Sequence, residues 1–324
     1  MNYNISFTII IVTYNSENTV SKCIKSVIDQ VTLDDEIVVV DNASTDSTVG
    51  ILTPFSEDLK LFISDFNFGF SSACNFAVEK STSPYILFLN PDAIINPGLL
   101  CRARESFSKG DYQLVGFMCR DEIGEIDRNY RRYPGFLASF MDYYSRNSIS
   151  KIRDNFNLDT HYLDGSCMFI ERSIFLKAGM FVNFFLYGED VILCNKIQKI
   201  GVKSIYHQDI FYTHLRGASS ATISGDRSWD MLPNIVYSEL YFLKGRSFSY
   251  RFFYLVEKIS ESASVGFLLF VFSRDSKSKI SFFKNRCDLL LKYSFEYLFQ
   301  GNKFYKPEFH QENYKIENRA FLIE

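Results

Sequence analysis

Four strand-like runs alternate with helical patterns along residues 7–89, and this order constrains the fold more than any other feature of the chain. The runs are short and rich in β-branched and aromatic residues: Phe7–Val12, Glu36–Val40, Lys60–Ser64 and Tyr85–Leu89. Such continuous apolar runs are typical of strands buried on both faces. The order β-α-β-α-β-α-β therefore predicts an α/β fold with a mostly parallel sheet and right-handed crossovers.

Helices are expected between these strands and in the second half of the chain, where strand signals are sparser. Apolar residues recur at helical spacing in Val20–Ile28, and further helices are expected near Thr48 and over Ser71–Lys80. Residues 111–160 are less regular. Five elements are expected later in the chain. They are a strand with a glycine break at His161–Ile170, a short helix at Ile174–Ala178, a longer helix from Glu189, a strand at Lys203–Tyr206 and a loop at His214–Gly217.

Polar, turn-forming residues follow each of the four strands. They are Thr13-Tyr14-Asn15, Asp41-Asn42, Asn67-Phe68-Gly69 and Asn90-Pro91-Asp92. Ligands of open α/β sheets bind beyond the carboxyl ends of the strands, so we expect the functional site there. Loops are polar in any case. An aspartate close behind an apolar strand is nevertheless uncommon, because aspartate is a poor strand residue, and it occurs here twice, at Asp41 and Asp92.

Two common phosphate-binding motifs are absent from the sequence. No GxGxxG follows the first strand and no GxxxxGK[ST] occurs anywhere, which argues against nicotinamide and P-loop folds. A protein that handles a diphosphate without a glycine loop usually needs a metal ion. Hard divalent cations prefer oxygen ligands, and Asp92 is a candidate ligand.

Charge and cysteine usage narrow the class of protein. The formal net charge of −3 argues against bulk nucleic-acid binding. The seven cysteines include no CxxC pair, which favours a reducing compartment and offers no zinc site. The N-terminal segment lacks a basic region, and no uncharged apolar stretch reaches about 18 residues. We therefore predict a cytoplasmic protein with neither a signal peptide nor a membrane-spanning helix.

The near-neutral total charge conceals a basic, aromatic C-terminal segment. Residues 240–306 contain 12 Lys and Arg against 5 Asp and Glu, together with 18 Phe and Tyr. Basic residues interleaved with aromatics fit a surface that rests on an anionic bilayer. The alternative is a helical appendage whose aromatics pack on the rest of the protein while Lys and Arg stay solvated. A nucleic-acid surface is the third reading, and nothing else in the sequence supports it.

Taken together and in this order, the motifs resemble the inverting glycosyltransferases of family 2, which have the GT-A fold. The segments that carry the resemblance are residues 8–16, 38–48, 67–75, 87–93, 164–181, 184–194 and 213–220. The version LNPDA, with residues 121–134 and 238–244, most resembles the branch that uses dTDP-L-rhamnose. The resemblance implies a GT-A domain over 1–225, with a nucleotide-sugar half at 1–110 and an acceptor half at 111–225. Residues 226–324 would be a helical C-terminal region.

The resemblance also implies a nucleotide-sugar pocket. It assigns nine residues to that pocket: Thr13, Tyr14, Asn15, Asp41, Asn67, Gly69, Asn75, Asn90 and Arg216. Asp41 would accept the imide N–H that uracil and thymine share, and Arg216 would contact the diphosphate. The alternative is that Asp41 caps the following turn. For Asn67, Gly69 and Asn75, ordinary turn and helix-start chemistry is an equal alternative.

Asp92 occupies the last position of the family's DxD-like motif, whose first aspartate is replaced by Asn90. The resemblance implies that Asp92, completed by His214, binds Mg²⁺ or Mn²⁺ beside the diphosphate. A plain Asn-Pro-Asp turn is the structural alternative for Asp92. A lone histidine is likewise more often structural than a ligand.

Glu189-Asp190 begins a predicted helix. The family uses the aspartate of this pair as general base, so Asp190 would take the proton of the acceptor hydroxyl while Glu189 orients the acceptor or the loop. Asp164 and Gly165 would lie on the acceptor side. Acidic residues are also favoured at a helix start by the helix dipole, which is the structural alternative.

The function that follows from the resemblance is sugar transfer in the synthesis of a bacterial surface polysaccharide such as O-antigen or capsule. L-rhamnose would move from dTDP-rhamnose to a hydroxyl of a glycan acceptor, usually lipid-linked, at the cytoplasmic face of the inner membrane. A UDP-sugar donor is an alternative, as is a non-catalytic subunit that binds a nucleotide sugar. A nucleotidyltransferase is a further alternative, although the chain lacks a Gly/Arg/Lys-rich triphosphate loop.

Overall fold

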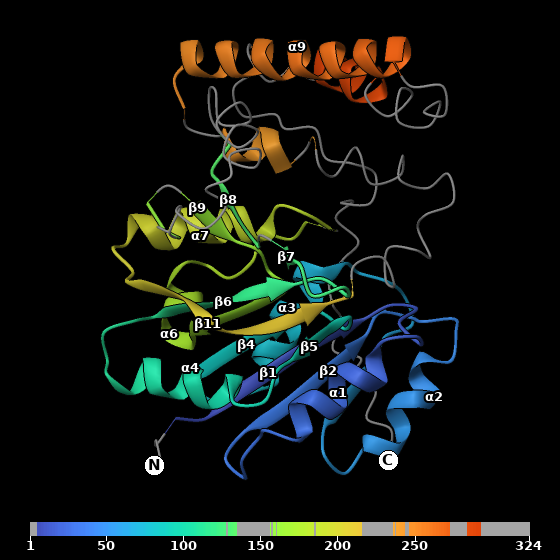
Figure 1. Cartoon of the computed structure of the whole chain (residues 1–324), viewed down its shortest axis with the longest axis vertical. Coiled ribbons are helices and arrows are strands. Elements are labelled where there is room, and N and C mark those ends of the chain that lie inside the picture. Colours follow the sequence, from blue (N-terminus) through green and yellow to red (C-terminus); the bar gives the residue numbers. More distant parts are fainter. Residues whose placement is uncertain are drawn as a thin grey trace.

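A curled mixed sheet of nine strands, covered by helices on both faces, forms the centre of the molecule (Figure 1). The computed structural model describes residues 5–127, 129–134, 156, 158–159, 161–184, 186–215, 236, 238–243, 246–272 and 284–292. The first four strands in the sheet order run parallel: β3 (Lys60–Ile63), β2 (Glu36–Asp41), β1 (Phe7–Thr13) and β4 (Tyr85–Leu89). The sheet continues with β10 (Cys167–Glu171), β6 (Leu114–Arg120), β11 (Ser204–His214) and β5 (Ala93–Ile95).

Strand direction changes in the second half of the sheet. β10 runs antiparallel to both β4 and β6, β11 is parallel to β6, and β5 is antiparallel to β11. The short β7 (Ile126–Asp127) pairs with the C-terminal end of β6. A separate two-stranded ribbon consists of β8 (Tyr130–Arg132) and β9 (His161–Leu163).

Alternation along the central strands explains why they are apolar throughout. Ile9 and Ile11 belong to one buried cluster with residues of α1 (Val20–Ile28) and α4 (Leu99–Ser108). The intervening residues Ile10 and Val12 belong to a second cluster, on the other face, with α3, α6 and α7. These three helices span Phe70–Glu79, Arg172–Lys177 and Glu189–Lys199. A sheet buried on both faces leaves only its strand ends available for binding.

The structure confirms the predicted α/β class and the positions of the first four strands and their helices. α2 (Thr48–Leu52) begins at the predicted residue and is followed by a 3₁₀ turn at Thr53–Phe55. One expectation was wrong: His214 is the last residue of β11, not part of a loop. The register of β11 against β6 shifts between His207 and Phe211, and this irregularity interrupts the strand pattern in the sequence.

The sheet curls so far that two strands adjacent in the chain lie at distant places in the strand order. β5 begins at Ala93, four residues after β4 ends at Leu89, yet β10, β6 and β11 lie between them in the sheet. Ala93 is the register partner of His214 at the end of β11. The curl therefore brings the residues that follow β4 against the last residue of β11.

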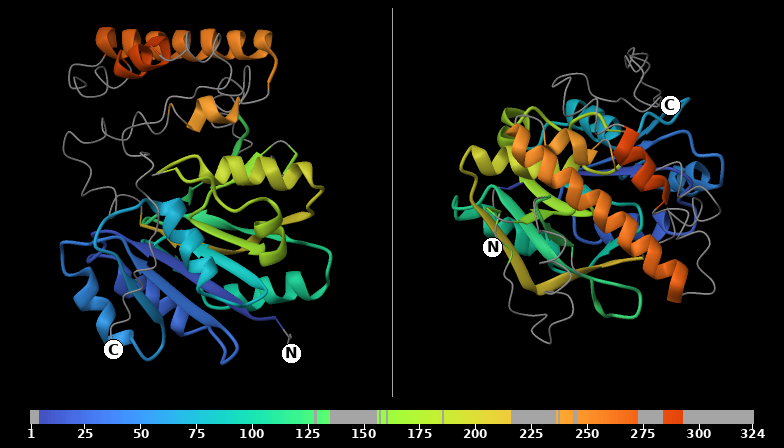
Figure 2. Two further views of the ribbon diagram at one scale, coloured as in Figure 1. Left: turned by 180° about the vertical axis from the view of Figure 1, so that it is seen from behind. Right: turned by 90° about the horizontal axis from the view of Figure 1, so that it is seen from above.

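The C-terminal part of the chain packs on α7. Val191 and Ile192 of that helix share a third buried cluster with Leu240 and Leu255. Leu255 belongs to α9 (Phe248–Phe272), a long helix at the end of the molecule opposite α1 and α2 (Figures 1 and 2). The part of the chain that the structure describes includes no helix with the length and apolarity needed to span a membrane. Packing on α7 is thus observed, and bilayer contact stays a prediction.

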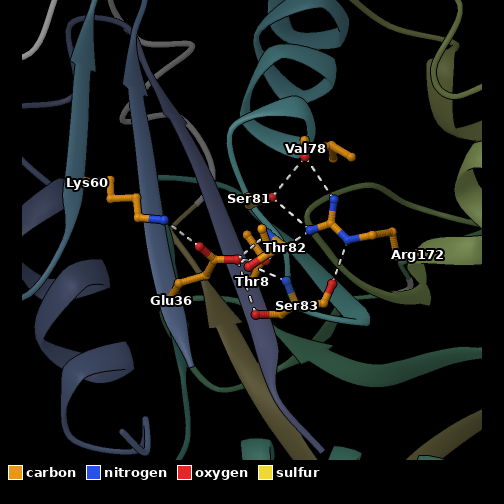
Figure 3. A network of polar contacts seen from close by, with 8 residues as sticks. All are labelled: Thr8, Glu36, Lys60, Val78, Ser81, Thr82, Ser83 and Arg172. Atoms are coloured by element: carbon orange, nitrogen blue, oxygen red, sulfur yellow. Dashed lines mark hydrogen bonds and ion pairs between the residues drawn. The ribbon is translucent and has the colours of Figure 1, made fainter. Parts of the chain in front are cut away.

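A polar network joins β1, β2, β3, α3 and α6 at the amino ends of the parallel strands (Figure 3). Glu36 Oε1 accepts hydrogen bonds from Thr8 Oγ1 at 2.7 Å and from the backbone N–H of Thr82 at 2.6 Å, and Oε2 accepts one from Lys60 Nζ at 2.7 Å. Burial opposes ionisation of Glu36, but these bonds and those from Ser83 outweigh it and lower its pKa to about 2. The carboxylate therefore stabilises the fold near neutral pH, and this contribution is lost as the pH falls from about 4.5 toward 2.

Arg172 closes the same network from the start of α6 (Figure 3). Its guanidinium donates to the carbonyls of Ser83 at 2.5 Å and Val78 at 2.8 Å, and to the hydroxyls of Ser81 at 2.8 Å and Thr8 at 3.2 Å. One side chain thus fixes the turn between α3 and β4 against both β1 and α6.

Replacing Arg172 by methionine is expected to lower the free energy of unfolding by about 2–4 kcal/mol, because it leaves several buried acceptors without a donor. Urea denaturation of both proteins measures the difference. Lys60→Met is the matched control. It removes a half-exposed ammonium from the same network and is expected to cost less than about 1 kcal/mol. Equal losses in the two variants would contradict the role given to Arg172.

Candidate active site

Asp41 ends β2 in a fully buried position and anchors the first of the carboxyl-edge loops. Its Oδ1 accepts hydrogen bonds from Thr13 Oγ1 at 2.8 Å and Ser44 Oγ at 2.5 Å, and its Oδ2 accepts one from the backbone N–H of Ser44 at 2.9 Å. A carboxylate has about four acceptor positions. Asp41 thus caps its own turn and retains capacity for one further donor at Oδ2.

The loops that follow β1 and β2 are tied together by Asn15. Asn15 adopts a left-handed backbone conformation with φ of 49°. Its backbone N–H donates to Ser44 Oγ at 2.9 Å, and its side-chain oxygen accepts from the backbone N–H of Thr45 at 2.8 Å. Tyr14 is 39% exposed beside this joint. Thr13, Tyr14, Asn15 and Asp41 therefore form one continuous wall at the edge of the sheet.

The third loop is held by Gly69 and Asn67. Gly69 has φ of 85° and ψ of 163°, a conformation that is essentially restricted to glycine. Its N–H donates to Asn67 Oδ1 at 2.9 Å, and its carbonyl accepts from Asn42 Nδ2 at 3.3 Å. Asn75 lies within α3 and exchanges two hydrogen bonds with the backbone of Phe181, at 2.9 and 3.2 Å. The Asn75 amide is therefore engaged in fixing the loop after α6.

Asp92 and His214 meet where β5 pairs with the end of β11. Asp92 Oδ1 lies 3.0 Å from His214 Nε2, and both residues are buried. The backbone reinforces this contact, because the N–H of Leu215 donates to the carbonyl of Asp92 at 2.9 Å. The other ring nitrogen of His214, Nδ1, is buried and has no hydrogen-bond partner among the residues that the structure describes. A carboxylate oxygen and an imidazole nitrogen thus stand side by side although 122 positions separate them in the chain.

Two further residues with metal-ligating groups lie beside His214, and no sequence motif indicates them. Cys119 Sγ, an Asp127 carboxylate oxygen and a His214 ring nitrogen all lie within 4.8 Å of one another. Cys119 is near the end of β6 and Asp127 is in β7, so both residues lie on the hairpin that these two strands form. Their spacing matches no ligand motif, because the curl of the sheet creates the proximity.

Glu189 and Asp190 begin α7, where the helix dipole favours negative charge. Asp190 Oδ1 accepts the N–H of Val191 at 2.7 Å, and Oδ2 accepts the N–H of Gly165 at 3.3 Å. Glu189 is buried, and its Oε2 has no hydrogen-bond partner in the described part of the chain. The two neighbouring carboxyl groups therefore occupy different environments.

These environments determine which carboxyl group is ionised. Burial raises the pKa of Glu189, and the neighbouring Asp190 and Asp164 charges raise it further. Burial and Asp164 also raise the pKa of Asp190, but the N–H groups of Val191 and Gly165 and the charge of Arg131 oppose the rise. Two adjacent buried carboxyl groups do not readily ionise together. We infer that Glu189 holds the proton near neutral pH and that Asp190 carries the charge.

Backbone hydrogen bonds connect the Asp190 region to the loop after β4. Gly165 donates to Asp190, and the carbonyl of the next residue, Ser166, accepts the N–H of Asn90 at 3.0 Å. The Glu189-Asp190 and Asn90-Pro91-Asp92 motifs thus lie on either side of one short turn. Arg216, the ninth residue assigned to the nucleotide pocket, lies outside the described residues.

Gly188 sets the direction in which α7 begins. It has φ of 95°, and a Cβ atom placed on it would lie 2.3 Å from Ser238 Cβ. Gly201 follows the other end of α7 with φ of 75° and has open space where its Cβ would lie.

Gly188→Ala is therefore expected to lower the free energy of unfolding by about 2–5 kcal/mol, from left-handed strain together with overpacking. Gly201→Ala is expected to cost only about 1–2 kcal/mol, from strain alone. Urea denaturation compares the two variants. A loss at Gly188 no larger than that at Gly201 would show that Ser238 does not restrict the start of α7.

The family model described as glycosyl transferase family 2 matches residues 8–179, which include the loops after the first four strands. Among curated proteins, the chain is 24% identical over 193 residues to an N-acetylglucosaminyl-diphospho-decaprenol L-rhamnosyltransferase of Mycobacterium tuberculosis, covering 52% of this chain and 63% of that protein. It is 31% identical over 169 residues to the rhamnosyltransferase WbbL of Escherichia coli K12, covering 47% and 64% of the two chains. The matches span just under two thirds of these relatives' length.

Solved structures agree on the fold. Staphylococcus aureus TarS 1–349 in complex with UDP-GlcNAc superposes with a TM-score of 0.54 at 17% identity, covering 91% of this chain and 82% of that chain. The mannosyltransferase PcManGT of Pyrobaculum calidifontis, in complex with GDP-Man and Mn²⁺, gives a TM-score of 0.52 at 16% identity, covering 91% and 87%. At this identity the likeness concerns the fold alone.

Proposed function

The chain belongs to glycosyl transferase family 2, and on that premise we propose that it is an inverting glycosyltransferase. It moves a sugar from a nucleoside diphosphate to a hydroxyl group of a glycan acceptor. The observation that carries the proposal is the grouping of Asp41, Asp92 with His214, and Asp190 at the carboxyl edge of the sheet. Nucleotide binding, diphosphate neutralisation and proton removal each require one of these groups.

For the donor we propose dTDP-L-rhamnose, with a UDP-sugar as the alternative. The similarity to proteins named as rhamnosyltransferases supports this choice. For the acceptor we propose a lipid-linked saccharide of a bacterial surface polysaccharide, since the mycobacterial relative's name specifies a diphospho-decaprenol acceptor. Such a substrate places the enzyme at the cytoplasmic face of the inner membrane, in peripheral contact through its basic, aromatic C-terminal segment.

We propose that Mg²⁺ or Mn²⁺ binds between Asp92 and His214. Asp92 Oδ1 and His214 Nε2 lie 3.0 Å apart and share a hydrogen bond. A carboxylate oxygen and an imidazole nitrogen are both ligands that Mn²⁺ accepts, so these two residues would hold the ion in place of that hydrogen bond. When bound, the ion supplies positive charge that stabilises the departing diphosphate. With Asn90 in place of a second carboxylate, the substrate's own oxygens complete the ligand set.

The chain's own residues perform the remaining steps. Asp41 holds the imide N–H of the base at Oδ2, which retains capacity for one further donor, and Thr13, Tyr14 and Asn15 line the base pocket. Asn67 and Gly69 shape the sugar side of the pocket. Ionised Asp190 accepts the proton of the attacking hydroxyl as that oxygen bonds to the anomeric carbon and the diphosphate leaves from the opposite side. Glu189, neutral and buried, orients the acceptor by donating a hydrogen bond.

The test is transfer from dTDP-L-rhamnose, and from a panel of UDP-sugars, to lipid-linked N-acetylglucosamine in the presence of Mn²⁺. Product formation with inversion at the anomeric carbon, followed by NMR, is the expected result. Donor binding by calorimetry without turnover on any acceptor would favour a non-catalytic nucleotide-sugar-binding subunit instead. Release of diphosphate from a nucleoside triphosphate would favour a nucleotidyltransferase. Turnover unchanged by a chelator would remove the metal from the proposal.

A further inference from the structure

A largely buried chain of polar side chains runs behind the candidate active site, and the function proposed above makes no use of it. In bonding order, it consists of Tyr206 on β11, Asn129 in the segment before β8, Tyr212 on β11 and Ser166 in the turn before β10. Asn129, Tyr212 and Ser166 have no exposed surface. Buried polar groups that are fully hydrogen-bonded specify one arrangement of the elements that carry them.

The direction of each hydrogen bond follows from one carbonyl group. Asn129 Nδ2 donates to the backbone carbonyl of Phe117 at 3.0 Å, and a carbonyl can only accept, so this contact fixes the orientation of the amide. The same nitrogen therefore donates to Tyr212 Oη at 3.1 Å, and Asn129 Oδ1 accepts from Tyr206 Oη at 2.6 Å.

Tyr212 must then donate its own hydrogen to Ser166. The Tyr212 Oη to Ser166 Oγ distance is 2.6 Å. A tyrosine hydroxyl carries its hydrogen at neutral pH, and Asn129 already donates to Tyr212 Oη, so this hydrogen is directed to Ser166. Each member of the chain thus has one defined role, and removing the Tyr212 hydroxyl would leave both Asn129 and Ser166 without a partner they now have.

Two members of this chain, Asn129 and Ser166, are joined to the candidate active site. The backbone N–H of Asp164 donates to the carbonyl of Asn129 at 2.8 Å, and the N–H of Asn90 donates to the carbonyl of Ser166. Between them, Gly165 donates to Asp190. Tyr212 itself lies two residues before His214 on β11. The turn Asp164–Ser166 is therefore held by the buried chain on one side and holds the candidate base on the other.

We propose that Tyr212, oriented by Asn129, is a positioning residue that sets the Asp164–Ser166 turn and thereby the distance between Asp190 and the donor-side loop at Asn90. This inference rests on the proposed function for its kinetic consequence, but its structural consequence stands without it. A reacting group displaced by as little as about 1 Å loses on the order of 100-fold in rate.

The experiment compares the full-length wild type with Tyr212→Phe, Ser166→Ala and the double variant. Phenylalanine keeps the ring and removes only the hydroxyl. We expect Tyr212→Phe to lower kcat roughly 10- to 100-fold while the KM for the donor changes less than about twofold. Because the two hydroxyls act together, the double variant should be no slower than Tyr212→Phe alone. Tyr85→Phe, which removes a hydroxyl at the amino end of β4, is the matched control and should leave kcat unchanged.

A second measurement separates this inference from the proposed function. Hydrogen exchange followed by mass spectrometry should show faster exchange in peptides covering Asn90 and Asp164–Ser166 in Tyr212→Phe, and no change there in Tyr85→Phe. Unchanged exchange together with unchanged kcat would overturn the inference. If exchange accelerates but the wild type transfers no sugar from any donor, the positioning role stands and the proposed function fails.

Discussion

Asp190→Asn is expected to lower kcat by about 10²–10⁴-fold, the largest effect expected of any single substitution in this chain. Asparagine has nearly the same shape, and its side-chain oxygen still accepts the N–H of Val191, so the start of α7 is preserved. What is lost is the capacity to accept the proton of the acceptor hydroxyl. Initial rates under saturating donor and acceptor measure kcat, and calorimetry with the nucleoside diphosphate should show unchanged affinity.

The neighbouring carboxyl group provides the control for this substitution. Glu189→Gln is expected to lower kcat by less than about tenfold, because the neutral glutamate and glutamine both donate a hydrogen bond. Since burial and Asp164 raise the pKa of Asp190, the acid limb of kcat/KM should lie at higher pH than for an exposed aspartate. Arg131→Met should move that limb further toward high pH, because the Arg131 charge lowers the pKa of Asp190. Full activity in Asp190→Asn would remove the base from the mechanism.

Asp92→Asn is expected to lower kcat by at least about 100-fold, because the substitution removes the single carboxylate assigned to the metal ion. The same variant should lose the dependence of nucleoside diphosphate affinity on Mn²⁺, which calorimetry with and without the ion measures directly. His214→Ala should act in the same direction, since its Nε2 lies 3.0 Å from Asp92 Oδ1.

A substitution that raises the affinity for the metal ion would also test this site. Asn90→Asp restores the carboxylate that the DxD-like motif lacks, and it is expected to lower the Mn²⁺ concentration that gives half-maximal rate. Asp58→Asn, on the exposed turn before β3, is the neutral control. Wild-type rates in Asp92→Asn, combined with insensitivity to chelation, would contradict a metal at this position.

The first half of the fold could be predicted because strands buried on both faces need apolar residues at nearly every position. β1, β2 and β4 are continuous apolar runs, and their predicted bounds differ from the observed ones by at most one residue. The expectation that polar residues gather beyond their carboxyl ends followed from topology alone. The placement of Asp41 and Asp92 beyond strand ends follows from the strand pattern without the family resemblance.

The second half could not be predicted to the same extent, because its strands depend on distant partners. β11 contains Gln208 and Asp209 within its span, and its register shift masks the alternation that identifies a strand. β5 is three residues long and forms only by pairing with β11. For the same reason, no spacing in the sequence indicates that Cys119 and Asp127 lie beside His214. The pairing of Asp92 with His214 came from resemblance to a family and not from the residues themselves.

The position of β5 has a consequence for how the protein is made. The ribosome synthesises Ala93–Ile95 long before Tyr212–His214, the strand segment with which these residues pair. Contacts between residues so distant in sequence close late in folding, because the loop entropy is lost before the contact forms. β1 to β4 can assemble during synthesis, whereas the Asp92–His214 pair appears only when β11 is complete. We therefore expect the nucleotide-sugar donor to bind only after the entire sheet has formed.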